Sequence, residues 1–223
     1  MVIYSLASIV NRVSNLEIII PNILNQSDLI FVNLIGQKEI PNILKQKNII
    51  VNSFKDAGSE IRFYNYNDIP DDSYYFTIDD DILYPDDYAK IMIENMNRYE
   101  NNVSCCVHGS NIDKNLNDGF YKKNRKVFHF KEELSKNIEV MIPGVGTSCF
   151  YKKNTKINIE DYKVRNMSDT YTGCFLSKQG IKRISIKREK MWIRPLNEFN
   201  CRIYGNNPHE EIDNMINKYK DIL

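Results

Sequence analysis

The first third of the chain alternates between short apolar runs and stretches in which apolar residues recur at helical spacing. Residues 2–9 and 29–34 are apolar runs of strand length, and residues 49–51 form a weaker one. Residues 16–24 carry apolar side chains three or four positions apart, which is typical of an amphipathic helix. Pro21 falls inside this pattern and predicts a short or kinked helix. The order strand, helix, strand predicts a βαβ start.

A further apolar run ends in three consecutive aspartates. Residues 73–78 are apolar on both faces, as a central parallel strand requires, and Asp79, Asp80 and Asp81 follow directly. Pro85 and the two acidic residues after it predict a helix start, because carboxylates complement the positive end of the helix dipole. The triplet is therefore expected at the edge of a sheet, between a strand and a helix.

The second half of the chain shows the same patterns with shorter runs. Residues 103–108 and 147–151 predict strands, residues 111–125 predict a polar loop, and residues 138–142 lead into a glycine-bearing turn. Residues 208–210 predict the start of a last helix. No repeat or low-complexity linker divides the chain. We therefore expect a single Rossmann-like α/β domain over all 223 residues, with a central, mostly parallel sheet flanked by helices.

Composition disfavours several classes of protein. The net charge of +1 gives no basic footprint for nucleic acid, and 42% hydrophobic residues are ordinary for a soluble domain. No segment approaches the roughly 20 apolar residues of a membrane span, and the N-terminus lacks the basic start of a signal peptide. Five cysteines without a CxxC pair argue against a disulfide framework and a zinc site. We expect a cytoplasmic protein, which leaves peripheral contact with a membrane open.

The aspartate triplet is the strongest chemical feature of the sequence. The C-terminal edge of a parallel sheet is where open α/β folds bind ligands. Mg²⁺ and Mn²⁺ prefer oxygen ligands and commonly take one or two carboxylates from the protein, while substrate phosphates and water complete the shell. The alternative is a solvated acidic turn, which we favour for Asp86 and Asp87. For Asp79, Asp80 and Asp81, which abut the apolar strand, we favour a functional role.

The segment YFTIDDDILYPDDY at residues 75–88 resembles the DxD region of GT-A glycosyltransferases, especially family 2-like enzymes of bacterial surface-polysaccharide assembly. SIVNR at residues 8–12 resembles the first-strand motif that holds the nucleotide, without the proline that often precedes the arginine. KDAGS at residues 55–59 resembles the segment that lines the donor, with arginine at position 62 where lysine is usual. The resemblance implies donor-binding roles for Ser8, Arg12, Asn33, Asp56, Arg62, Asp79 and Asp80.

Two segments in the second half extend the resemblance. PGVGT at residues 143–147 resembles the turn beside the sugar pocket, where Gly144 and Gly146 let the backbone approach a ligand closely. SDTYTG at residues 168–173 resembles the acidic motif that supplies the catalytic base. This makes Asp169 the candidate base, although Ser168 stands where the family often has a second acid.

The resemblance implies a metal-dependent enzyme that moves a sugar, with inversion, from a nucleotide-sugar to a hydroxyl of a glycan or glycolipid. A UDP-sugar is the favoured donor. Residues 1–100 would form the nucleotide-binding half and residues 101–223 the acceptor-binding and catalytic half. Asp81 would bind Mn²⁺ or Mg²⁺, and Asp79 would lie nearer the ribose. His209 is a weaker candidate for the metal shell, because it also fits a simple helix start.

The remaining polar signals have plainer interpretations beside functional ones. His108 follows a predicted strand, where it fits either an acceptor contact or a structural histidine, and His129 fits strand alternation. A basic run fits either a solvated loop or contact with anionic lipid or a polyanionic acceptor. Its members are Lys122, Lys123, Arg125 and Lys126.

Two other functions stay open at the level of sequence. The triplet also matches the nucleophile loop of haloacid-dehalogenase-like phosphatases, but that class carries the motif on its first strand, and Leu83 stands where threonine or valine is usual. A catalytically degenerate GT-A module that binds a nucleotide or glycan would explain the departures at Arg62 and Ser168.

Overall fold

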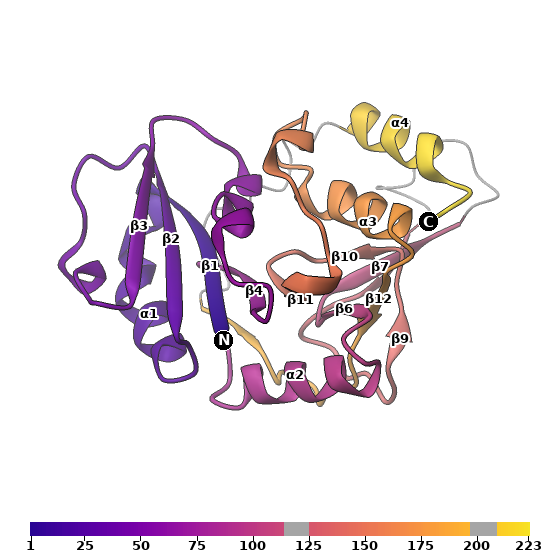
Figure 1. Cartoon of the computed structure of the whole chain (residues 1–223), viewed down its shortest axis with the longest axis horizontal. Coiled ribbons are helices and arrows are strands. Elements are labelled where there is room, and N and C mark those ends of the chain that lie inside the picture. The colour runs from indigo at the N-terminus through magenta and orange to yellow at the C-terminus, as the bar shows by residue number, and fades with distance from the viewer. Residues whose placement is uncertain (114–124, 197–208) are drawn as a thin grey trace.

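The first half of the chain contributes four parallel strands to one side of the molecule (Figure 1). The structure is a computed structural model and describes residues 1–113, 125–196 and 209–223. β1 pairs with β2 and with β4, and β2 pairs with β3, all in parallel. Each strand lies where an apolar run predicted one, since a strand covered on both faces needs continuous apolarity. The bounds are β1 Val2–Ile9, β2 Leu29–Ile35, β3 Ile49–Phe54 and β4 Tyr74–Asp79.

Strands from the second half continue the same sheet beyond β4. The order is β3-β2-β1-β4-β11-β6-β12-β9. β6 and β12 are parallel, whereas β11 runs antiparallel to both β4 and β6, and β9 runs antiparallel to β12. The predicted fold class is confirmed: the protein is mixed α/β, with a central, mostly parallel eight-stranded sheet. The bounds here are β6 Val103–Cys106, β9 Ile138–Glu139, β11 Thr147–Tyr151 and β12 Lys182–Ser185.

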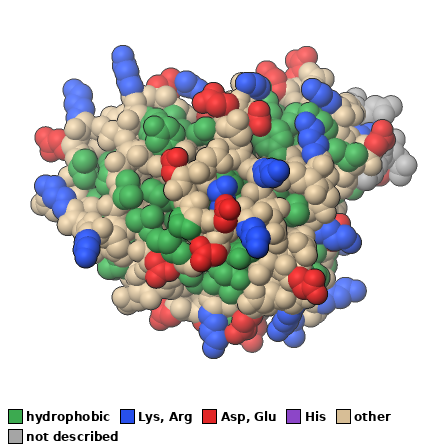
Figure 2. Space-filling view, in the orientation of Figure 1, with side chains coloured by type: hydrophobic (Ala, Val, Ile, Leu, Met, Phe, Trp, Pro, Cys, Tyr) green, Lys and Arg blue, Asp and Glu red, His purple; other side chains and the backbone are tan. Residues whose placement is uncertain are grey.

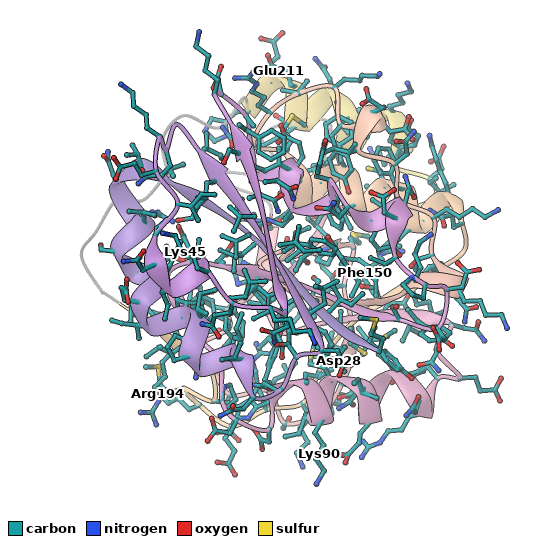
Figure 3. The ribbon with its side chains drawn as sticks, turned by 60° about the vertical axis from the view of Figure 1, so that its left-hand side comes forward. Asp28, Lys45, Lys90, Phe150, Arg194 and Glu211 are labelled. Atoms are coloured by element: carbon teal, nitrogen blue, oxygen red, sulfur yellow. The ribbon has the colours of Figure 1, made fainter. Side chains whose placement is uncertain are left out.

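Helices cover both faces of the sheet, and neighbouring strand residues alternate between two cores. Leu6 and Ile78 pack in the core that contains α1 and α2, while Ile3 and Phe150 pack in the core that contains α3 and α4. Figure 3 shows Phe150 in the interior, whereas Lys90 points away from α2. This alternation follows from the pleat of a strand. The bounds are α1 Leu16–Leu24, α2 Tyr88–Arg98, α3 Ser168–Lys178 and α4 His209–Tyr219, with a 3-10 turn η3 at Ser59–Phe63.

A smaller antiparallel sheet adjoins the predicted polar loop over residues 111–125, of which residues 114–124 lie outside the described part of the chain. β7 Gly109–Ile112 pairs with β8 Arg125–Phe128 and with β10 Ile142–Pro143. The loop prediction was wrong at residues 111, 112 and 125, which lie in strands because they pair with segments distant along the chain. A two-stranded ribbon is formed by β5 Ile82–Leu83 and β13 Arg194–Pro195.

The helix starts agree only partly with the sequence. α2 begins at Tyr88, just after the acidic residues that follow Pro85. α3 begins at Ser168, within the segment that resembles an acidic motif, and so places Asp169 in its first turn. Gly173 lowers the helix propensity of this segment. A larger residue would not fit at this position, because a Cβ there would lie 2.7 Å from the Met141 carbonyl oxygen. α4 begins at His209; the predicted start at Pro208 lies outside the described residues.

On the face shown in Figure 2, groups of apolar side chains lie between charged and polar ones. The large hydrophobic side chains that are most exposed are dispersed along the chain rather than gathered in one segment; they include Val10, Ile18, Ile40, Ile50 and Tyr64. Across residues 1–113, 125–196 and 209–223, each helix is too short or too polar to cross a membrane.

Candidate functional site

The register of β1 and β4 brings the aspartate triplet beside the end of the first strand. Ala7 lies opposite Asp79 in the parallel pair, so the next residues, Ser8 and Asp80, are neighbours. The Ser8 hydroxyl donates a hydrogen bond to Oδ2 of Asp80 at 2.6 Å. Both side chains are buried. Ser8 therefore fixes the position of the Asp80 carboxylate through a buried hydrogen bond.

Arg12 connects two of the three aspartates. It lies in the 3-10 turn that follows β1, and its Nη1 is 3.1 Å from Oδ1 of Asp80 and 3.0 Å from Oδ2 of Asp81. The Asn15 amide donates to the Asp80 carbonyl oxygen at 3.0 Å. Burial raises the pKa of Asp80, against the Ser8 hydrogen bond and the Arg12 charge, which lower it. Burial and the neighbouring Asp79 raise the pKa of Asp81 to about 6, against the lowering effect of Arg12.

Asp79 forms an ion pair with a second arginine and packs against a glycine. Nη1 of Arg62, in η3, is 2.8 Å from Oδ1 of Asp79. A Cβ on Gly146 would lie 1.8 Å from Oδ2 of Asp79, so only glycine permits this packing. The Tyr84 hydroxyl donates to the Gly146 carbonyl oxygen at 2.6 Å and accepts from the Asp79 backbone N–H at 2.9 Å. These contacts link the triplet to the glycine-bearing turn.

Asp169 reaches the same turn from the first turn of α3. Its Oδ1 accepts a hydrogen bond from the Val145 backbone N–H at 2.9 Å. Burial raises the pKa of Asp169 to about 6, the Val145 hydrogen bond acts against this, and the negative charge of Asp79 adds to it. A carboxylate that titrates at about 6 suits proton abstraction near neutral pH, since general bases work best when their pKa lies near the working pH.

These groups line one open cavity of about 660 Å³. Eight of its lining residues are site residues expected from the sequence, namely Arg12, Arg62, Asp79, Asp80, Asp81, Gly144, Gly146 and Asp169. They come from both halves of the chain, and the cavity is large enough for a nucleotide-sized ligand.

Asn33 and Asp56 lie outside this cavity. Asn33 is fully buried: its amide donates to the Leu6 carbonyl at 3.0 Å, and its own oxygen accepts from Asn52 at 2.9 Å. It therefore stabilises the sheet and cannot meet a ligand in this arrangement. Asp56 is exposed and forms an ion pair with Arg165 at 2.6 Å.

His209 lies outside the cavity, whereas one residue of the basic run lines it. His209 starts α4 and does not line the cavity, so its position fits the helix-start interpretation. Lys122 and Lys123 lie outside the described residues. Arg125 is described, and its side chain lines the cavity.

Among the cavity residues that were not assigned to the site from sequence are two histidines and a lysine. His108, His129 and Lys131 line the cavity together with Arg125. His108 follows the buried strand β6, the same signal that marked the triplet after β4, but a lone histidine in that position has a common structural interpretation. His129 and Lys131 carry no motif. They reach the cavity only because β8 folds back against β7.

The residues fit a substrate-assisted metal site better than a protein cage. Among the described residues, no group of three or more His, Cys, Asp or Glu side chains is arranged to hold a metal ion. Asp79 and Asp81 keep 36% and 35% of their side-chain surface exposed, and an arginine contacts one oxygen of each, so either carboxylate could offer its other oxygen to a metal ion. Mg²⁺ and Mn²⁺ commonly use one or two carboxylates with substrate phosphates, and that is what this arrangement offers.

Comparisons with known proteins leave the family open. No protein-family model matches the chain, and no curated protein matches it. Among solved structures it is similar to one described as "Crystal Structure of A197 from STIV", at 14% identity and a TM-score of 0.37, over 92% of this chain and 97% of that one. A TM-score this low supports no inference about function.

Proposed function

We propose that the protein is a metal-dependent glycosyltransferase that uses a nucleotide-sugar, with a UDP-sugar favoured. One observation carries this proposal. A carboxylate triplet after the central strand β4 shares a single cavity with Asp169, a separate carboxylate whose pKa is raised to about 6. Transfer of a sugar from a diphosphate needs both functions: a site for the leaving group and a base for the acceptor hydroxyl.

The triplet and its arginines form the donor end of the cavity in this proposal. Asp81 would hold Mn²⁺ or Mg²⁺ together with the donor diphosphate. The ion supplies positive charge that stabilises the negative charge developing on the leaving group. Asp79 would contact the ribose, while Arg12 and Arg62 keep the carboxylates oriented through contacts of 2.8–3.1 Å.

Asp169 would accept the proton of the acceptor hydroxyl as that oxygen attacks the anomeric carbon. The Val145 N–H fixes Oδ1, which leaves Oδ2 to face the hydroxyl. The Gly144–Gly146 turn can lie close to Asp79 because Gly146 has no side chain. This turn connects the base to the donor end of the cavity. A base and a leaving group on opposite faces of the sugar produce inversion of configuration.

The test is hydrolysis or transfer of a panel of UDP- and GDP-sugars, measured with Mn²⁺ and with EDTA. We expect turnover that disappears in EDTA and in Asp81→Ala. The matched control is Asp86→Ala, which removes an exposed carboxylate five residues away. Titration calorimetry should show weak Mn²⁺ binding alone and tighter binding with UDP present. Tight binding to the protein alone would instead indicate a structural cation.

A binding module without catalysis is the second candidate, because one observation favours it. Arg12 and Arg62 already pair with all three aspartates, which reduces their negative charge toward a metal. This candidate predicts nucleotide binding that is unaffected by EDTA, with no turnover. Release of phosphate from phosphomonoesters would support a phosphatase and contradict both.

A further inference from the structure

The cavity has a second, basic end, formed by His108, Arg125, His129 and Lys131. All four side chains are half-buried and line the same space as the aspartates. Lys131 forms no ion pair within the described part of the chain. Neither the proposed donor site nor the proposed catalytic base uses these four residues.

His108 shows the electrostatic character of the basic end most clearly. Its ring lies edge-on to that of His129, with centroids 5.2 Å apart. Burial, followed by the charges of His129, Arg125 and Arg188, lowers the pKa of His108 to about 3. Its Nδ1 is buried and has no hydrogen-bond partner among the described residues. The charged groups that act on His108 are basic ones, namely His129, Arg125 and Arg188, and such groups favour an anion.

Arg188 adds a fixed positive charge behind the two imidazoles. It is 5% exposed, and its guanidinium donates to the carbonyl oxygens of His129 at 2.9 Å and Glu132 at 3.0 Å. These bonds hold the segment that carries His129 and Lys131 against the cavity. The basic end is thus positioned by buried contacts rather than by exposed side chains alone.

The basic end adjoins Asp169. A recess of about 20 Å³ is lined by both His108 and Arg125 and by Asp169. The charge of Arg125 is also one of those that lower the pKa of Asp169. A molecule whose hydroxyl faces Asp169 therefore has its neighbouring substituents at the basic end.

We propose that the acceptor carries an anionic group, a carboxylate or a phosphate, which binds at the basic end formed by His108, Arg125, His129 and Lys131. The identification of the ligand as an acceptor rests on the proposed function, whereas the binding of an anion at the basic end does not. A carboxylate or phosphate would receive charge-assisted hydrogen bonds from Arg125 and Lys131 and an N–H from an imidazole. A neutral hydroxyl would gain less from the same donors.

The test follows the three histidine imidazoles by NMR while sugars are added without any donor. His209, outside the cavity, serves as the internal reference. The probes are methyl β-glucuronide, glucose 6-phosphate, inorganic phosphate and the neutral methyl β-glucoside. We expect His108 and His129 signals to shift with at least one charged sugar, at an affinity about tenfold or more above that for the glucoside.

Variants make the test specific. Arg125→Gln should weaken binding of the charged sugar about tenfold or more, since it removes a charged donor. His129→Gln provides a second variant, and Arg98→Gln, an exposed arginine at the end of α2, is the matched control. Equal binding of the neutral and charged sugars would overturn the proposal, and so would inorganic phosphate binding as tightly as the sugars. Anion binding without glycosyl transfer would leave this site standing and remove only the proposed function.

Discussion

At the scale of single residues, Gly146 and Asp169 decide what the cavity can do. A Cβ on Gly146 would overlap the Asp79 carboxylate at 1.8 Å, so a larger residue there must displace this carboxylate. Asp169 is set by burial and by one hydrogen bond from Val145. Each residue supports a prediction that separates binding or chemistry from stability.

Gly146→Ala should displace Asp79 and weaken nucleotide binding about tenfold or more. The added methyl group must move a carboxylate that is paired with Arg62, which costs about 1–3 kcal/mol of stability as well. The control is Gly180→Ala. It strains a residue with φ of 70° but meets nothing within 4 Å, so it should lower stability and leave binding intact. Calorimetry with UDP and Mn²⁺, beside urea denaturation, gives both quantities.

Asp169→Asn should abolish transfer, with a loss of about 10²–10⁴-fold, and also stabilise the protein above pH 6. The folded pKa is raised to about 6, so the folded protein carries a disfavoured charge at pH 8. Asparagine removes that charge and can still accept from Val145. We expect a gain of about 1–2 kcal/mol at pH 8.

This gain should shrink as the pH falls below 6, where the native carboxyl is protonated and neutral in the folded state. Urea denaturation at pH 8, 6 and 4.5 measures the trend. Asp161→Asn, at an exposed position, should show no such pH dependence. A gain that is equal at all three pH values would contradict the burial of charge at Asp169.

At the scale of elements, α1 is the short helix that the sequence predicted, and packing sustains it through a proline. Pro21 lies inside the helix, where it removes one backbone hydrogen bond, yet the helix runs from Leu16 to Leu24. Leu16, Ile19 and Ile20 are fully buried against the sheet. Burial of this apolar face is what keeps the helix intact through the proline.

Pro21→Ala should stabilise the protein by about 1–3 kcal/mol, because it restores a backbone N–H that can bond the Glu17 carbonyl. Pro21 is exposed, so the substitution changes little packing. Urea denaturation measures the gain, and Ile18→Ala, at an exposed position of the same helix, should change stability by much less. A loss of stability would show that the proline directs the path of the helix.

At the scale of the whole molecule, the sheet joins the two halves of the chain at its centre. β4, which carries the triplet, pairs with β1 on one side and with β11 on the other. Trp192, the single tryptophan, packs against Tyr88 at a centroid distance of 5.6 Å. The second half therefore contributes to the core of the first.

We expect the chain to unfold in one cooperative transition. Trp192 fluorescence and far-UV circular dichroism should give the same urea midpoint, because neither half retains a complete sheet alone. A fragment of residues 1–100 should remain unfolded, since β4 would lose its partner β11. Two separated midpoints, or a folded fragment, would show that the halves are independent domains.

Much of the fold was predictable, and the site only in part. The strands of the first half follow apolar runs, and Asp79, Asp80 and Asp81 follow the strand that positions them. The family resemblance implied that Asn33 contacts the donor. In the structure its side chain instead forms hydrogen bonds with Leu6 and Asn52 inside the sheet. The role of a polar residue depends on what surrounds it, and neighbours far apart in sequence are not visible in a local pattern.

By itself, the sequence determined the elements of the first half and the position of the triplet at a strand end, because hydrophobic periodicity and turn chemistry act over a few residues. Only the tertiary structure decided the register that sets Ser8 beside Asp80, and the fold-back of β8 that brings Arg125 and His129 to the cavity. Those contacts join residues distant along the chain, and their free energy depends on the assembled sheet and its burial.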